Sequence, residues 1–292
     1  MTIATAHEPR ALKGVLLVLA AVFLFAIADA ATKHLTMAYA VPLVISGRYL
    51  VNVLLLVAVY GPRHGATLLH TRRTGLVLLR GLCLAMASLT MGLALGVMPL
   101  GETVTIIYLA PFAVMLLAGP LLGEKVSVAG WIGALIAFAG VLLILRPGGA
   151  LDPFGVVLAL INACLGTAYH LLTRVLSKTE STMALLFYTA LVGLIVFAVL
   201  LVPGLGPMPS LADGALIVVL GALATLGHFL FTAAYREAPA SLLAPVNYFH
   251  LVWAAVLGWL VFGHMPDAIS LFGMGLVITA GIAVAIRAQR AG

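Results

Sequence analysis

The chain repeats part of its own sequence at a spacing of about half its length. Residues 95–127 align with residues 235–267, an offset of 235 − 95 = 140, and Tyr108 then meets Tyr248. In a membrane chain, internal duplication is typical of transporters. We therefore expect two copies of one unit, residues 12–147 and residues 152–288.

Composition indicates that a membrane is the solvent for most of the chain. Hydrophobic residues make up 64% and charged residues 8% of the sequence, against about 45–50% and about 25% in soluble domains. The net charge of +6 does not predict a nucleic-acid partner, because most basic residues lie in short gaps between apolar runs, as expected for residues that set membrane orientation.

Ten apolar runs have about the 20 residues that a membrane-crossing helix needs. The predicted fold is all-α, with transmembrane helices at 12–35, 41–61, 74–96, 100–120, 127–146, 154–176, 182–202, 213–233, 240–262 and 267–287. The connections between the runs are too short for an additional domain.

The positive residues predict the orientation of these helices. One side of the membrane collects twelve of the fifteen Lys and Arg residues when alternate gaps are counted. We therefore expect both termini in the cytoplasm. Five helices in each copy is an odd number, so the second copy enters the membrane inverted relative to the first.

Asp29 is an acidic residue inside the first run, where a charge usually faces a cavity, a partner or water. Lys33 follows one turn later on the same helical face. One interpretation is an internal Asp–Lys pair, or a carboxylate close enough to the interface to reach water. The other is a site for a substrate ammonium group or a proton. At an offset of 141, the near-counterpart of Asp29 is His170.

Other polar residues within the runs have two interpretations each. Arg48 could bind a substrate carboxylate or phosphate, or its head could reach the outer lipid headgroups. His228 and His250 could shuttle protons, or each could be a neutral donor bonded to a carbonyl. Glu102 is explained by the dipole at a helix start.

Proline interrupts two runs that the repeat relates to each other, at Pro111 and Pro245. Each proline removes a backbone hydrogen bond, and freed carbonyls in a membrane are tolerated only where protein or a cavity receives them. We therefore expect two bent helices that present Tyr108, Asn247 and Tyr248 to a substrate. The alternative is a kink that only improves packing.

Sequence signatures of cofactor chemistry are missing. There is no Walker-type phosphate loop, no metal-ligand spacing and no Ser/His/Asp set on a water-facing domain. We expect no cofactor, no metal and no enzymatic activity.

The chain resembles the drug/metabolite transporter superfamily, and within it the ten-helix type with two EamA domains. The segments that carry this resemblance are FAIADAATKHL (25–35), MPLGETVTIIYLAPF (98–112), LLGEKVSVAGWIGALIAFAGVLLILRPG (121–148), LGHFLFTAAYREAPASLLAPVNY (226–248) and VWAAVLGWLVFGHMPD (252–267). They look most similar to the S-adenosylmethionine and riboflavin uptake carriers. The resemblance implies a secondary carrier of the bacterial inner membrane with a central cavity between the two halves.

The sequence therefore predicts a secondary transporter of a small polar or zwitterionic metabolite that works by alternating access. Its partners would be that metabolite and the lipid bilayer, with monomer and homodimer both open. Alternatives are a riboflavin or nucleoside-like carrier, a metabolite or metallophore exporter, and an integral-membrane enzyme. The expected substrate residues are Asp29, Arg48, Tyr108, His170, Asn247 and Tyr248, and the expected proton carriers are Asp29 and His228.

Overall fold

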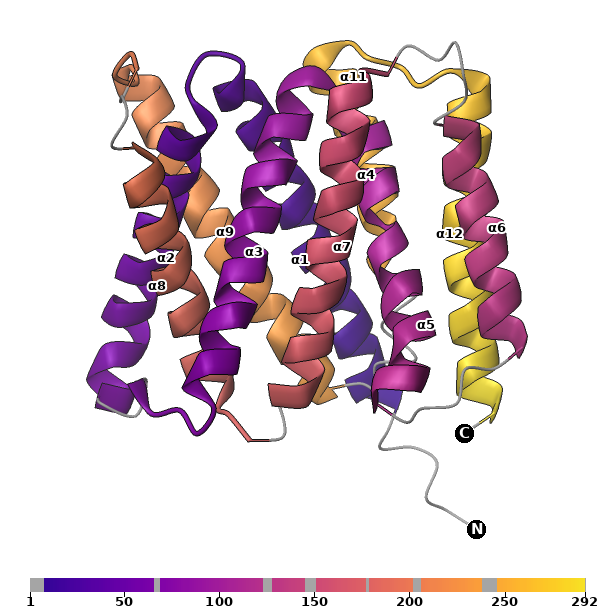
Figure 1. The fold of residues 1–292 in the computed structure, drawn as a ribbon, viewed down its shortest axis with the longest axis horizontal. Coiled ribbons are helices and arrows are strands. Elements are labelled where there is room, and N and C mark those ends of the chain that lie inside the picture. Colours follow the sequence, from indigo (N-terminus) through magenta and orange to yellow (C-terminus); the bar gives the residue numbers. More distant parts are fainter. Residues whose placement is uncertain are drawn as a thin grey trace. The chain divides into compact units, whose positions relative to one another are not determined.

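The computed structural model describes residues 8–65, 69–122, 128–144, 151–176, 179–201, 206–237 and 246–291. Within these ranges all regular secondary structure is helical (Figure 1). The helices are α1 (Glu8–Thr36), α2 (Val41–His64), α3 (Thr74–Val97), α4 (Leu100–Ile107), α5 (Leu109–Leu122), α6 (Val128–Ile144), α7 (Pro153–Leu176), α8 (Thr182–Leu201), α9 (Leu211–Glu237), α11 (Phe249–Phe262) and α12 (Ala268–Ala291). Each predicted apolar run overlaps at least one of them.

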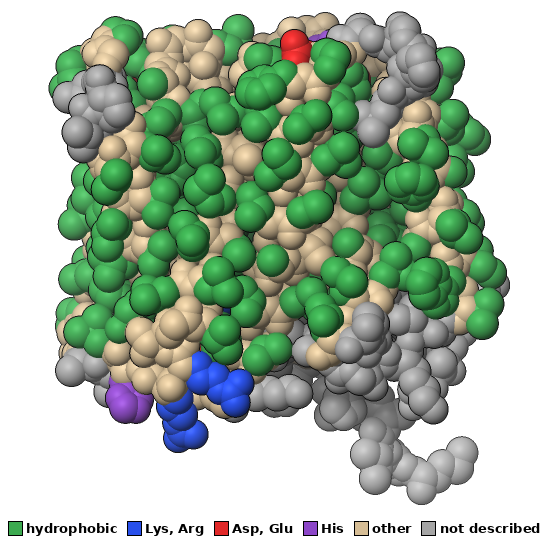
Figure 2. Space-filling model, viewed as in Figure 1, with side chains coloured by type: hydrophobic (Ala, Val, Ile, Leu, Met, Phe, Trp, Pro, Cys, Tyr) green, Lys and Arg blue, Asp and Glu red, His purple; other side chains and the backbone are tan. Residues whose placement is uncertain are grey.

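The helices are apolar on the outside as well as the inside. In the described part of the chain, six helices are long and apolar enough to cross a membrane, and four shorter apolar helices accompany them. Large apolar side chains such as Leu135 and Phe272 are more than 60% exposed, and hydrophobic side chains cover the helices on the face in Figure 2. Such a surface suits lipid and not water, so the chain is a multi-pass membrane protein.

The helical contacts divide the chain into two compact units. The first unit comprises Met1–Ala30, Pro99–Ala150 and Leu226–Gly292, and it contains α4, α5, α6, α11 and α12. In this unit α6 packs along α12 at two glycines: a Cβ atom added to Gly273 would lie 2.5 Å from the carbonyl oxygen of Gly140. The two backbones therefore touch, which is how membrane helices associate closely.

The second unit comprises Ala31–Met98 and Leu151–Thr225, with α2, α3, α7 and α8. Its interior holds the guanidinium group of Arg80, whose residue is 3% exposed. That group donates to hydroxyls of Thr173, Thr189 and Tyr169 at 2.6–2.8 Å and to the carbonyl of Leu185 at 3.1 Å. Arg80 thus joins α3 to α7 and α8.

The predicted fourth span is two helices instead of one. α4 ends at Ile107 and α5 begins at Leu109, with Tyr108 between them. Pro111 has no N–H group, so the carbonyl of Ile107 lacks its usual partner four residues on. The break therefore falls one turn before the proline. Pro245 lies outside the described residues.

Candidate functional site

Asp29 lies in α1 and pairs with a histidine from the other half of the sequence. Its Oδ2 atom is 3.2 Å from Nε2 of His250, and the two side chains are 22% and 10% exposed. His250 is the second residue of α11. The two groups are not aligned for a hydrogen bond. They attract each other as opposite charges whenever Asp29 is ionised and His250 is protonated.

Tyr108 holds the other nitrogen of the same imidazole ring. Its hydroxyl is 3.0 Å from Nδ1 of His250, and it also donates to the backbone carbonyl of Asn247 at 3.2 Å. The break between α4 and α5 places Tyr108 where both partners are in reach.

The Tyr108 hydroxyl has one proton, so it can donate to only one of its two partners at a time. This choice determines which nitrogen of His250 carries a proton. If that proton goes to Asn247, Nδ1 must donate to the tyrosine oxygen. Nε2 then faces Asp29 favourably only when a proton lies between them, either on the imidazole or on the carboxyl group. If the tyrosine donates to Nδ1 instead, neutral His250 carries its proton on Nε2. The cluster can therefore hold and relocate a proton.

Aromatic rings extend this polar cluster. Tyr248 lies 5.6 Å from the ring of Tyr108 and 5.9 Å from that of Phe112, measured between centroids. The side-chain oxygen of Asn247 is buried and has no hydrogen-bond partner among the described residues. A buried amide oxygen of this kind can accept a hydrogen bond from a ligand without losing a protein partner.

The structure thus brings Asp29, Tyr108, Asn247 and Tyr248 into one cluster within the first unit. Sequence reasoning missed His250 as the residue that links them. The available signal was its position three residues after Asn247, which places both on neighbouring positions of a helical face. Lys33, the expected partner of Asp29, donates to the carbonyls of Leu95 and Met98 at 2.7 Å.

Arg48 and His170 lie in the second unit. One Nη atom of Arg48 donates to the Ser88 hydroxyl at 2.8 Å, and the guanidinium lies over the ring of Tyr49. No carboxylate contacts Arg48 in the part of the chain that the structure describes, and its Nε atom is buried without a partner. The His170 side chain is exposed, with its ring edge-on to that of Tyr169.

His228 belongs to the first unit and lies in α9, where its ring is 4.9 Å from the ring of Phe25. Among the described residues no group of three or more His, Cys, Asp or Glu side chains could hold a metal ion.

Apolar membrane-crossing helices with a partly buried cluster of ionisable and aromatic groups define an integral membrane protein of the transporter type. The EamA-like transporter family model matches the chain twice, at residues 12–146 and 153–286. The chain belongs to the EamA-like transporter family.

Several curated proteins are similar over most of their length. The pseudopaline exporter CntI of Pseudomonas aeruginosa is 26% identical over 93% of this chain and 95% of its own. An S-adenosylmethionine uptake transporter of Rickettsia bellii is 29% identical over 78% of each chain. A riboflavin transporter of Rhizobium johnstonii is 26% identical over 95% of this chain and 92% of its own.

A protein of known crystal structure has the same fold. It is 19% identical in sequence and superposes with a TM-score of 0.70. The match covers 98% of this chain and 100% of the other.

Proposed function

We propose that the protein is a secondary transporter that moves a small polar or zwitterionic metabolite across a bacterial inner membrane by alternating access. The observation that carries this proposal is the Asp29–His250–Tyr108 cluster, because ionisable groups inside apolar helices are costly and are retained for function. The three curated relatives support it, since each is named for moving a metabolite.

The proposed architecture is ten membrane spans in two inverted halves, with both termini in the cytoplasm and the substrate site between the halves. The double match to one family model supports the duplication. The distribution of Lys and Arg supports the orientation.

The proposed roles follow from the chemistry of each side chain. Asp29 and His250 hold a proton or pair with a substrate ammonium group. Tyr108, Asn247 and Tyr248 orient the substrate by hydrogen bonding and ring contact. Arg48 contacts an anionic group, because its guanidinium has no carboxylate partner among the described residues. His170 supplies a second switchable charge, and His228 is an alternative proton carrier.

A second candidate is a carrier of flavin or nucleoside-like compounds, favoured by the ring contacts of Tyr108, Tyr248 and Phe112. Export of a metallophore is a third, by similarity to the pseudopaline exporter.

Counterflow in proteoliposomes tests the proposal. Vesicles preloaded with one unlabelled compound are given the same compound in labelled form, and the panel includes amino acids, S-adenosylmethionine, riboflavin and a metallophore. Saturable accumulation of one compound supports the carrier and identifies its substrate class. Chemical conversion of the compound would show an enzyme, and no accumulation with any member of the panel would count against the proposal.

A further inference from the structure

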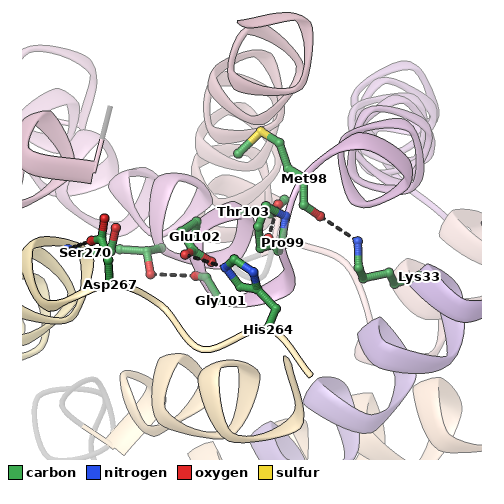
Figure 3. Close-up of polar contacts among 10 residues, drawn as sticks. Lys33, Met98, Pro99, Gly101, Glu102, Thr103, His264, Asp267 and Ser270 are labelled. Atoms are coloured by element: carbon green, nitrogen blue, oxygen red, sulfur yellow. Dashed lines mark hydrogen bonds and ion pairs between the residues drawn. The ribbon is translucent and has the colours of Figure 1, made fainter. Parts of the chain in front are cut away.

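Glu102 and His264 form a second carboxylate–imidazole pair in the first unit, separate from the Asp29 cluster. Oε1 of Glu102 is 3.0 Å from Nε2 of His264 (Figure 3). The carboxylate is almost fully enclosed, with its side chain 4% exposed, whereas the imidazole is 42% exposed. Oε2 of Glu102 is buried without a hydrogen-bond partner among the described residues.

The start of α4 explains why this carboxylate turns to His264. Glu102 is the third residue of α4, a position from which Glu often bonds the backbone N–H of the N-cap residue. The N-cap here is Pro99, which has no N–H group, and the helix has no side-chain cap bond. The helix dipole favours the carboxylate charge, but one of its oxygens still lacks a donor.

The end of α11 presents the imidazole. Gly263 has φ +67°, a left-handed conformation that favours glycine. Its N–H bonds the carbonyl of Trp259, and the N–H of His264 bonds that of Gly258. This cap turns the chain so that the His264 ring lies against Glu102, and the pair joins the end of α11 to the start of α4.

The internal repeat does not provide a second pair of this kind. At the offset of 140, Glu102 corresponds to residue 102 + 140 = 242, a leucine, and His264 corresponds to residue 264 − 140 = 124, a glutamate. Leu242 and Glu124 cannot form a carboxylate–imidazole contact. The Glu102–His264 pair therefore has no counterpart at the positions that the repeat relates to it.

We propose that Glu102 and His264 form a proton-dependent latch that locks the end of α11 to the start of α4. This inference rests on the proposed transport function. Histidine gains its proton near neutral pH. Protonated His264 makes an ion pair with a buried carboxylate, whereas neutral His264 makes only a hydrogen bond. The latch is tight with the proton bound and loosens when His264 loses it.

Few other ionisable groups lie on the elements packed against α4. α5 and α6 carry none, α11 carries His250, the turn before α12 carries Asp267, and α12 carries Arg287 and Arg290 near its far end. Asp267 accepts the backbone N–H of Ser270 at the start of α12. His264 is thus the basic side chain that lies against Glu102.

Thermal unfolding in detergent tests the pair without any transported compound. The melting temperatures of the wild type, His264→Asn, Glu102→Gln and the control His70→Asn, which replaces an exposed histidine, are compared at about pH 8 and about pH 6. We expect the advantage of the wild type over His264→Asn and over Glu102→Gln to grow as the pH falls, with no such growth against His70→Asn. An advantage over His264→Asn that stays constant overturns the latch.

Counterflow at equal pH on both sides of the vesicle tests the effect on transport. We expect wild-type exchange to slow about fivefold between pH 8 and pH 6, the effect of a modest ion pair. Exchange by His264→Asn should slow about fivefold less than that of the wild type over the same range, because the variant has no imidazole to pair with Glu102. Identical pH profiles overturn the latch. If the wild type exchanges nothing, the transport proposal fails, and the melting temperatures still decide whether the pair binds a proton.

Discussion

Asp29 and His250 come from opposite ends of the sequence, and their side chains meet 3.2 Å apart inside a set of apolar helices. The pair links the first helix to α11, and Tyr108 fixes the far side of the imidazole ring. Removing either side chain leaves the other without this partner.

Replacing Asp29 with Asn should abolish or uncouple transport while the protein still folds. The amide keeps the size of the side chain but carries no negative charge and has no carboxyl group that could take up a proton. Uptake by the variant is to be measured across pH. Asp152→Asn is the matched control, because Asp152 only caps the start of α7 and Asn is an equally good cap. Wild-type uptake by Asp29→Asn at every pH would contradict its role.

Tyr108→Phe should lower the transport rate about fivefold to tenfold, because one hydrogen bond is worth about 1 kcal/mol. It should also shift the pH profile of transport, because Nδ1 of His250 loses its partner. Tyr49→Phe also removes a buried hydroxyl, bonded to Ser88, and should change the melting temperature without moving the pH profile. Equal shifts of the profile in both variants would show that Tyr108 has no special role.

Arg80→Ala should reduce stability far more than substrate affinity. It leaves several hydroxyl and carbonyl partners without a donor, at about 1–3 kcal/mol each. The melting temperature and the yield of folded protein should fall sharply, while the half-saturation concentration of the remaining protein stays near the wild-type value. Normal yield with a greatly raised half-saturation concentration would instead place Arg80 in substrate binding.

Gly273→Ala should destabilise the protein by about 1–3 kcal/mol, the usual cost of overpacking. The new methyl group would meet the backbone oxygen of Gly140 at 2.5 Å, so α6 and α12 must separate. Gly275→Ala is the control, because nothing lies within 4 Å of a methyl group there. Thermal unfolding of both variants measures the difference, and equal melting temperatures would rule out the close contact.

Glu180 should stabilise the protein at neutral pH and lose this effect in acid. Its burial acts to raise the pKa of the carboxyl group. The pKa is nevertheless held below its ordinary value by hydrogen bonds from the backbone N–H of Arg72, the Thr179 hydroxyl and the backbone N–H of Arg73, and by the positive charge of Arg72. A lowered folded-state pKa gives stability above the unfolded pKa of about 4.3 that is lost as the pH falls through the folded value.

Glu180→Gln tests this dependence through melting temperatures between about pH 7 and about pH 3.5, a range that spans the ordinary glutamate pKa. The gap between wild type and variant should narrow toward the acid end. A gap that does not change with pH would mean that the carboxylate charge contributes nothing.

The apolar runs predicted the helices well because length and hydrophobicity are local properties of the sequence. The same is true of Asp29, whose charge stands out in an apolar helix. His250 was harder to place, since its meaning depends on a contact with α1 that no local pattern encodes. Glu102 looked sufficiently explained by the helix dipole, and only the missing N–H of Pro99 indicates that it needs a further partner. Pairings between distant helices follow from packing, which periodicity does not specify.

Each compact unit takes helices from both halves of the sequence, so neither half contains a complete unit. Cutting the polypeptide after Ala150 would leave each unit divided between two fragments. Neither fragment should fold when produced alone, whereas both fragments synthesised in the same cell should assemble into a working molecule.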